Sequence, residues 1–304
     1  MADEIKAGRR KAAKLLFLTT ADTEILAAAR ATELLPEGFP EVRCANPTKL
    51  KDPRDFFEEA LPEAGVVMVR LLGGNRAWPE GLAELRRRCE ELRVPLLAFG
   101  GEAEPDAELT AVSTAPSGAV AEAFEYLRHG GVRNTENLFR FIADTLLVEG
   151  YGFEPPLPLP ERGVYHPDLP EGSQIEDLLA LHHPERPTVG VIFYRTHWMS
   201  ANTAFVDALV HALERAEVNT LPVYCYSLRA DERREVPALE MLEGRVECLV
   251  TTVLASGGSN AADASKTGSP EGWLEWDVPA LEALGVPVVQ GICATSSQIG
   301  RAHV

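Results

Sequence analysis

A short polar and aromatic stretch, residues 195–202, is the part of this sequence best suited to chemistry. It reads RTHWMSAN, places Arg195 and His197 close together, and ends at Asn202 and Thr203. A guanidinium binds carboxylates, and an imidazole can ligate a metal or move protons near neutral pH. Alternation along a strand would put Arg195 and His197 on the same side of its end. The residues alone favour a structural interpretation, in which Arg195 pairs with an acid and His197 hydrogen-bonds a loop carbonyl.

A buried strand and an amphipathic helix are expected to position this stretch. Residues 188–194 are apolar, β-branched and aromatic, which is typical of a strand buried on both faces. Residues 203–215 place their apolar side chains on one face of a helix. Open α/β sheets bind ligands at the carboxyl ends of strands, above a helix amino terminus. Asn202 and Thr203 are expected to cap the helix or, alternatively, to hold a ligand there.

Three further places carry residues with two interpretations each. Gly73 and Gly74 follow a predicted strand, and Gly257 and Gly258 follow another, so each pair serves either a tight turn or the close approach of a ligand. His166, in YHPD, is either a metal ligand or part of a turn, and turn chemistry is favoured. We therefore treat the four glycines as candidate substrate-binding residues. His166 and His197 are the candidate metal ligands, and the remaining metal ligands are unknown.

The order of predicted elements indicates the α/β class. The predicted strands cover residues 14–20, 41–45, 64–71, 94–99, 188–194, 220–226, 246–254 and 286–292. Helices are predicted between most of them, which implies parallel strands joined by right-handed crossovers. We expect two doubly wound, Rossmann-like or flavodoxin-like domains at residues 1–150 and 187–304. A proline-rich connector at 151–186, with six prolines between Pro155 and Pro170, would join them.

Composition and charge exclude several classes of partner. The chain has 304 residues, a formal net charge of -17, 45% hydrophobic and 25% charged residues. Such acidity disfavours nucleic acid and anionic membranes as partners. No run approaches the ~20 apolar residues of a membrane span, and the amino terminus lacks the apolar core of a signal peptide. The five cysteines form no CxxC pair, so we expect a cytoplasmic protein without a structural zinc site.

The usual nucleotide and hydrolase motifs are absent from the sequence. No GxGxxG follows a predicted strand, and neither GxSxG nor HExxH occurs. Lys266 and Thr267 resemble the end of a P-loop, but Ser265 stands where that motif needs glycine. We therefore expect no nucleotide site in this chain and disfavour an NAD-dependent enzyme.

The last seven residues, QIGRAHV at 298–304, have an unusual origin. They are the peptide that would be encoded by reading through a common sequencing-library adapter. We expect the native part of this sequence to stop near Ser297 and the gene to be longer, so that the second domain is truncated. The alternative is a genuine polar tail.

Several motifs, in their order and spacing, resemble the CobN-type large subunit of aerobic cobaltochelatase and, more distantly, the large H-type component of magnesium chelatase. The matching stretches are RLLGG at 70–74, NLFRFIADTLL at 137–147, GVYHPD at 163–168 and VGVIFYRTHWMSANTAFVDALVHALE at 189–214. The last is the strongest, although Thr196 and Ser200 depart slightly from the family's Arg-Ser-His-like turn. The resemblance covers nearly the whole chain up to about Ser297.

The resemblance implies a function that the residues alone do not. It implies a tetrapyrrole-binding subunit that inserts Co²⁺ into hydrogenobyrinic acid a,c-diamide, while ATP is hydrolysed by separate AAA+ partner subunits. Arg195 would bind a substrate carboxylate and His197 would assist proton or metal transfer, with Asn202 and Thr203 as further substrate contacts. Family members are several times longer, so this chain is expected to be inactive alone.

Two alternatives remain at this point. The chain could instead belong to the H-type component of a magnesium chelatase, with a porphyrin as substrate. It could also be a two-domain α/β small-molecule-binding protein without catalysis, whose ligand would lie between two sheets. A reading frame that continues beside genes for corrin synthesis or an AAA+ ATPase would favour a chelatase.

Overall fold

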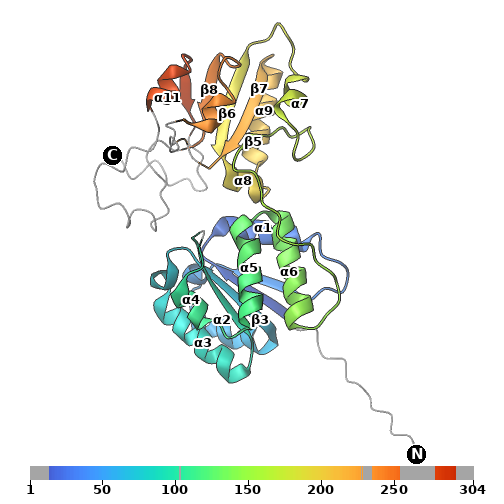
Figure 1. The fold of residues 1–304 in the computed structure, drawn as a ribbon, viewed down its shortest axis with the longest axis vertical. Helices are drawn as coiled ribbons and strands as arrows, with labels where there is room; N and C mark the ends of the chain where they lie inside the picture. Colours follow the sequence, from blue (N-terminus) through green and yellow to red (C-terminus); the bar gives the residue numbers. More distant parts are fainter. Residues whose placement is uncertain (1–13, 103, 227, 229–234, 254–277, 292–304) are drawn as a thin grey trace, which may run out of the picture. The chain divides into compact units, whose positions relative to one another are not determined.

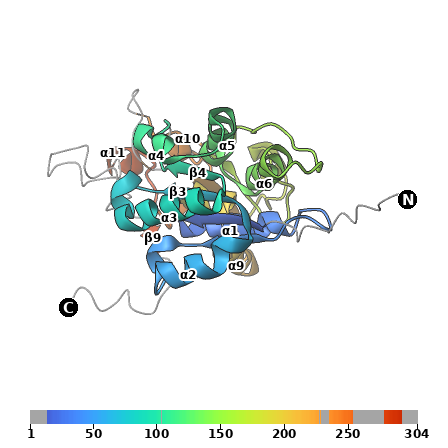
Figure 2. The same ribbon diagram turned by 90° about the horizontal axis from the view of Figure 1, so that it is seen from below.

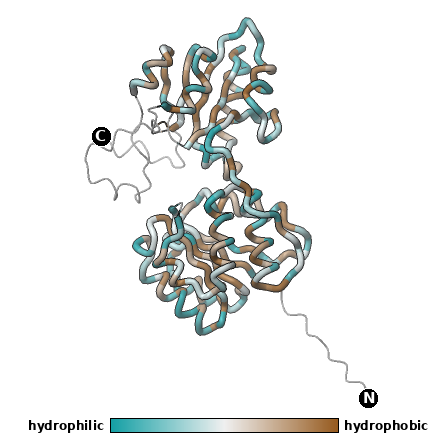
Figure 3. Tube along the Cα trace, in the orientation of Figure 1, coloured by the Kyte–Doolittle hydropathy of each residue, from teal (hydrophilic) through white to brown (hydrophobic). Residues whose placement is uncertain are grey.

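The computed structural model describes residues 14–102, 104–226, 228, 235–253 and 278–291. The chain divides into two compact units, residues 1–159 and 160–304. Each unit contains its own β-sheet with helices packed against it (Figure 1). In each, the apolar residues gather along the strands and on the helix faces that meet them (Figure 3).

The sheet of the first unit is parallel throughout. Its strands are β1 (Lys14–Thr19), β2 (Val42–Ala45), β3 (Ala64–Leu71) and β4 (Leu96–Gly100), in the spatial order β2-β1-β3-β4. Alternate residues of each strand enter opposite cores, so that Phe17 faces one core and Leu16 the other. Both faces are therefore covered, which explains why these strands read as continuous apolar runs.

Helices cover both faces of this sheet. They are α1 (Asp22–Thr32), α2 (Pro53–Ala60), α3 (Pro79–Leu92), α4 (Ala107–Val112), α5 (Ser117–His129) and α6 (Val132–Leu146), with short 3-10 turns η1 (Pro47–Lys49), η2 (Leu61–Glu63) and η3 (Gly74–Ala77). Figure 2 shows α5 and α6 on one side of the sheet and α2 on the other, in agreement with the two cores. Helix α4 was not predicted, because its six residues are too few for a helical period to stand out.

Helix α6 begins directly after a glycine pair. Its first residue is Val132, and Gly131 is its N-cap. Asn134 lies inside the helix, where its side chain donates to the Gly130 carbonyl and exchanges hydrogen bonds of 2.8 Å with the backbone of Leu157. Asn134 thereby fastens the first part of the proline-rich segment to the first unit.

The second unit repeats the strand order of the first. Parallel strands β6 (Thr188–Tyr194), β7 (Asn219–Cys225), β8 (Cys248–Thr251) and β9 (Val288–Gln290) lie in the order β7-β6-β8-β9. The helices are α7 (Ile175–Leu179), α8 (Arg195–Met199), α9 (Ala204–Arg215), α10 (Pro237–Glu240) and α11 (Val278–Ala283). The prediction of an α/β fold with parallel sheets is confirmed.

One strand of the second unit is antiparallel, which the sequence did not predict. Strand β5 (Gly163–Val164) pairs with the edge of β7, with Gly163 opposite Tyr224 and Val164 opposite Val223. It lies within the proline-rich segment, beyond Pro160. Its two residues are too few to show alternation, and only the tertiary pairing reveals the strand.

Candidate functional site

The stretch expected to be a loop after β6 is a short helix. Arg195–Met199 form α8 directly after Tyr194, and the hydroxyl of Ser200 closes its end by donating to the Thr196 carbonyl at 2.7 Å. The expectation that Arg195 and His197 share one side is therefore wrong. Residues two positions apart on a helix point in nearly opposite directions, whereas on a strand they would point the same way.

Arg195 is anchored at the start of α8. Its Nε donates to the Pro160 carbonyl oxygen at 2.8 Å, and the Glu161 carboxylate interacts with it electrostatically. Burial lowers the pKa of Arg195, although a guanidinium stays charged at neutral pH. The acid partner expected in the structural interpretation has a counterpart in Glu161.

His197 lies against α9. Its ring meets Phe205 edge to face, with 4.9 Å between the ring centroids, and its Nδ1 lies 3.5 Å from the side-chain nitrogen of Asn202. Burial lowers the pKa of His197 below its ordinary value. The imidazole is therefore neutral near pH 7, which is the form that accepts a proton or ligates a metal.

Neither Asn202 nor Thr203 caps α9 with its side chain. Thr203 is the N-cap residue but makes no side-chain capping bond, because its hydroxyl pairs with the Tyr165 hydroxyl at 2.9 Å. The Tyr165 hydroxyl in turn donates to Oδ1 of Asp207 at 2.6 Å. Asn202 instead closes the turn after α8, since its backbone N–H donates to the His197 carbonyl at 2.8 Å. The expected cap is replaced by a bond from a residue that directly follows β5.

His166 is held in place through both ring nitrogens. It is 5% exposed, its Nδ1 accepts from the backbone N–H of Asp168 at 3.2 Å, and its Nε2 lies 2.8 Å from Oε1 of Glu214. Because Nδ1 accepts a hydrogen bond, Nε2 carries the proton that is donated to Glu214. Tyr165 and His166 together fasten α9, and this explains the side chains of the GVYHPD motif structurally.

The glycine pair after β3 is required by its backbone. Gly73 and Gly74 have φ values of 92° and 69°, in the left-handed region that disfavours side chains. A Cβ on Gly74 would also lie 3.0 Å from Oδ2 of Asp106. The tight-turn interpretation thus accounts for both glycines, which belong to the first unit. Gly257 and Gly258 lie outside the described residues, as do residues 298–304.

An aromatic cluster beside Arg195 was missed by sequence reasoning. Trp198 stacks on Tyr224 with ring centroids 4.3 Å apart and an interplanar angle of 4°, and Phe193 packs edge to face on Tyr224. The sequence did contain a signal for this cluster. Tyr224 and Tyr226 are two residues apart at the end of a strand, so alternation predicts that both point to the same face of the sheet. Burial raises the pKa of Tyr224 to about 12, so its phenol stays protonated.

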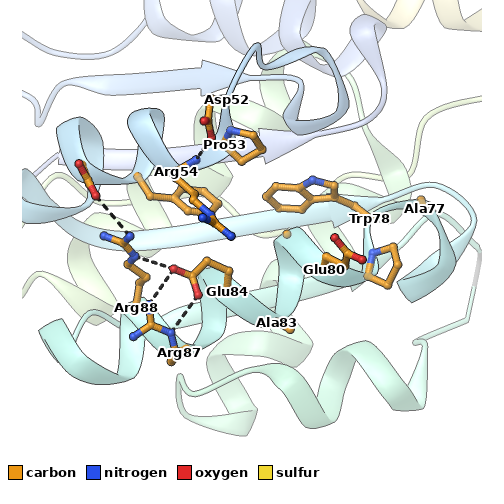
Figure 4. Close-up of a pocket in the computed structure, with 14 residues that line it drawn as sticks. Asp52, Pro53, Arg54, Ala77, Trp78, Glu80, Ala83, Glu84, Arg87 and Arg88 are labelled. Carbon is orange, nitrogen blue, oxygen red and sulfur yellow. Dashed lines mark hydrogen bonds and ion pairs between the residues drawn. The ribbon is translucent and has the colours of Figure 1, made fainter.

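A cavity of about 1110 Å³ lies in the first unit between α2 and α3 (Figure 4). Phe57 and Trp78 form an aromatic wall, with ring centroids 5.9 Å apart. Gly81 permits this arrangement, since a Cβ there would lie 2.0 Å from the indole. Glu84 bonds Arg87 and Arg88 on the opposite wall, and the hydrogen bonds hold its pKa at about 2. No residue predicted from the sequence as a site residue lines this cavity.

The described residues contain neither a metal-binding cluster nor a membrane-spanning helix. Within them, no group of three or more His, Cys, Asp or Glu side chains could hold a metal ion. In the same ranges, no helix has the length and apolar character required to cross a bilayer. Of the two predicted metal ligands, His166 is engaged by Glu214, whereas His197 contacts Asn202 and Phe205. A metal at His197 would therefore need ligands from outside these ranges.

Comparisons with known proteins agree on one family. The family model described as CobN/Magnesium Chelatase matches residues 124–300. The aerobic cobaltochelatase subunit CobN of Pseudomonas aeruginosa is 29% identical over 293 residues, covering 94% of this chain and 22% of the relative. The magnesium-chelatase H component of Rhodobacter capsulatus is 30% identical over 176 residues, covering 54% of this chain and 13% of the relative.

A solved structure supports the same relationship. The catalytic subunit of cobaltochelatase from Mycobacterium tuberculosis superposes with a TM-score of 0.65 and is 35% identical. The match covers 93% of this chain and 22% of that structure. The chain thus spans about a fifth of the length of the cobaltochelatase relatives. The region matched by the family model includes both α8 and α9.

Proposed function

This chain belongs to the CobN/magnesium chelatase family, and we propose that it forms part of the tetrapyrrole-binding subunit of a cobaltochelatase. The reaction would insert Co²⁺ into hydrogenobyrinic acid a,c-diamide. The observation that carries the proposal is that the family match contains β6, α8 and α9, with Arg195 anchored at the start of α8 and a neutral His197 two residues later, packed against α9. Substrates, partners and cytoplasmic location belong to the proposal for the whole subunit.

Cobalt is favoured over magnesium by the extent of the relationship and by ligand chemistry. The CobN relative matches 94% of the chain, whereas the magnesium-chelatase relative matches 54%. Imidazole nitrogen suits first-row transition metals, while Mg²⁺ prefers oxygen ligands. A neutral His197 therefore fits the handling of Co²⁺ better than that of Mg²⁺. Because magnesium chelatase subunits are also among the relatives, a porphyrin and Mg²⁺ are the second candidate pair of substrates.

The proposed chemistry is an exchange of ring protons for a metal ion. Co²⁺ loses bound water and binds the ring nitrogens, and the ring's N–H protons leave as this happens. His197, as a neutral base, would accept one of these protons or bind the metal before transfer. Arg195 would fix the ring by a charge-assisted bond to a peripheral carboxylate. Thr203 and Asn202 would act by holding α9 and the turn after α8.

Energy for the exchange would come from other subunits. The sequence contains no P-loop or dinucleotide fingerprint, so we assign ATP hydrolysis to AAA+ partners of the chelatase. Their nucleotide cycle would drive the large subunit between conformations that enclose or release the macrocycle. Residues 1–304 alone are expected to be inactive, since they correspond to 22% of the length of the CobN relative.

The test uses the complete subunit encoded by the native gene, assayed with its ATPase partners. We expect Arg195→Ala to weaken corrin binding by about tenfold or more, the loss typical of a charge-assisted hydrogen bond. His197→Ala should slow cobalt insertion while leaving corrin affinity within about twofold, because its role is in transfer. Unchanged affinity and unchanged insertion in both variants would remove these residues from the site.

A further inference from the structure

An exposed aromatic side chain stands beside the anchored guanidinium of the second unit. Tyr226 follows β7 directly, and Arg195 follows the neighbouring β6. The register pairs Tyr194 with Cys225, so Arg195 and Tyr226 come directly after paired residues at the same edge of the sheet. It is 70% exposed, more than any other large apolar side chain described except Val148. A tyrosine left this open at the carboxyl end of a parallel strand lies where α/β sheets bind ligands.

Tyr224, two residues before Tyr226 in the chain, belongs to a packed aromatic cluster. Tyr224 is 4% exposed, and Trp198 stacks on it in parallel. Gly163 on the neighbouring β5 leaves room for the Tyr224 phenol, because a Cβ on that glycine would lie 2.5 Å from the hydroxyl oxygen. We call Arg195, Trp198, Tyr224 and Tyr226 the aromatic–cationic patch. Tyr224 is its buried member, Arg195 and Trp198 are partly exposed, and Tyr226 is the member that solvent reaches most.

We propose that Tyr226 binds substrate by packing its ring against the conjugated face of a carboxylated tetrapyrrole whose carboxylate is bound by Arg195. This inference rests on the proposed function. It adds Tyr226 as a binding residue and gives Tyr226 and Arg195 separate roles. Tyr226 recognises the π-system of the ring, and Arg195 recognises the acid at its edge.

The chemistry of the patch fits such a ligand on both counts. Aromatic side chains pair with conjugated rings in offset or edge-to-face geometry, and tyrosine loses little conformational entropy when it does so. A guanidinium whose Nε is already fixed by the Pro160 carbonyl is pre-organised for a carboxylate. A purely apolar ligand would form no charge-assisted bond with Arg195, and a small carboxylic acid would make no ring contact with Tyr226.

The experiment measures binding of corrin and porphyrin acids to the complete subunit by fluorescence quenching. Each ligand is used as the free acid and as its methyl ester. Tyr226→Ala is expected to weaken binding of both forms about threefold to tenfold, the range for one aromatic pair. Tyr226→Phe should bind like the wild type, since the ring and not the hydroxyl carries the contact. Leu181→Ala, at another exposed apolar side chain of the same unit, is the matched control.

The ester separates the two roles. Arg195→Met should weaken binding of the acid. It should have little effect on binding of the ester, because the ester has no carboxylate for Arg195 to bind. The Tyr226→Ala effect should be the same with acid and ester. Equal binding by Tyr226→Ala and the wild type would overturn the inference. A loss that Tyr226→Phe does not restore, or one that accompanies a lower urea midpoint, would also overturn it by assigning Tyr226 a structural role.

Failure of the inference can be told apart from failure of the proposed function. If the wild-type subunit binds neither tetrapyrrole, the proposed function fails and the inference fails with it. If the wild type binds and Arg195→Met is impaired while Tyr226→Ala is not, the function stands and Tyr226 is excluded. A preference for the corrin over the porphyrin that disappears in Tyr226→Ala would further support Tyr226 as a residue that contacts the ring.

Discussion

Replacing Arg70 with methionine should severely destabilise the first unit. Arg70, at the end of β3, is a buried cation with three acceptors around it. It forms an ion pair of 2.8 Å with Glu24 and donates to the carbonyl oxygens of Leu127 at 2.6 Å and Gly100 at 3.2 Å. Methionine has a similar length and no donors. The change therefore removes every one of these bonds without opening a large cavity.

The expected loss is about 3–5 kcal/mol, the range for breaking one side of a buried ion pair. Little discount for solvent is needed, because the side chains of Arg70 and Glu24 are 8% and 23% exposed. Arg70→Lys keeps the charge but cannot reach all three acceptors, so about half of that loss is expected. Arg86→Met is the control, since the Arg86–Glu90 pair has a similar length of 2.9 Å but is exposed, and its loss should cost less than about 1 kcal/mol.

Hydrogen–deuterium exchange is the suitable assay because it reports on the two units separately. In Arg70→Met, the slowest amides of β1, β3 and β4 should lose about 3–5 kcal/mol of protection, while those of β6 and β7 should not change. If Arg70→Met and Arg86→Met lowered protection equally, by less than about 1 kcal/mol, the reasoning from burial would be refuted.

Two predictions concern the second unit. Tyr165→Phe removes the hydroxyl that donates to Asp207 and pairs with Thr203, and should destabilise this unit by about 1.5–3 kcal/mol, measured as protection of α9 amides. An unchanged exchange rate in α9 would show that the bond contributes nothing. The pKa of His197 is lowered by burial, so the unfolded chain gains a proton at higher pH than the folded chain. Stability should therefore fall as pH drops below about 6.5, and His197→Gln should reduce that dependence in urea titrations between about pH 5 and pH 8. Identical pH profiles for the two proteins would contradict this.

The regular elements were predictable because their signals are local. Strands 64–71 and 188–194 were predicted with the bounds that β3 and β6 have in the structure. Apolar side chains on every position of a strand reflect helices on both faces, so the pattern itself carries the architecture. The cap of α2 is local in the same way, because the Asp52 side chain accepts from the backbone N–H of Arg54 at 2.8 Å.

The side-chain geometry of the site was not predictable in the same way. Alternation suggested that Arg195 and His197 share a side, but α8 turns them apart. The local sequence RTHWM has no strong helix signal, and the helix is stabilised by Trp198 packing on Tyr224 from another strand. The cap expected at Thr203 was displaced for a similar reason, since Tyr165 from a distant segment takes its hydroxyl.

The α/β class, the order of the main strands and the family resemblance follow from the sequence alone, because periodicity and motif order can be recognised without knowing which residues meet in the folded chain. Which side chains meet depends instead on the folded chain. The stack of Trp198 on Tyr224, the bond between His166 and Glu214, and the three acceptors of Arg70 all join residues far apart in the sequence. Such contacts depend on the register and order of strands, which are fixed by packing of the whole sheet.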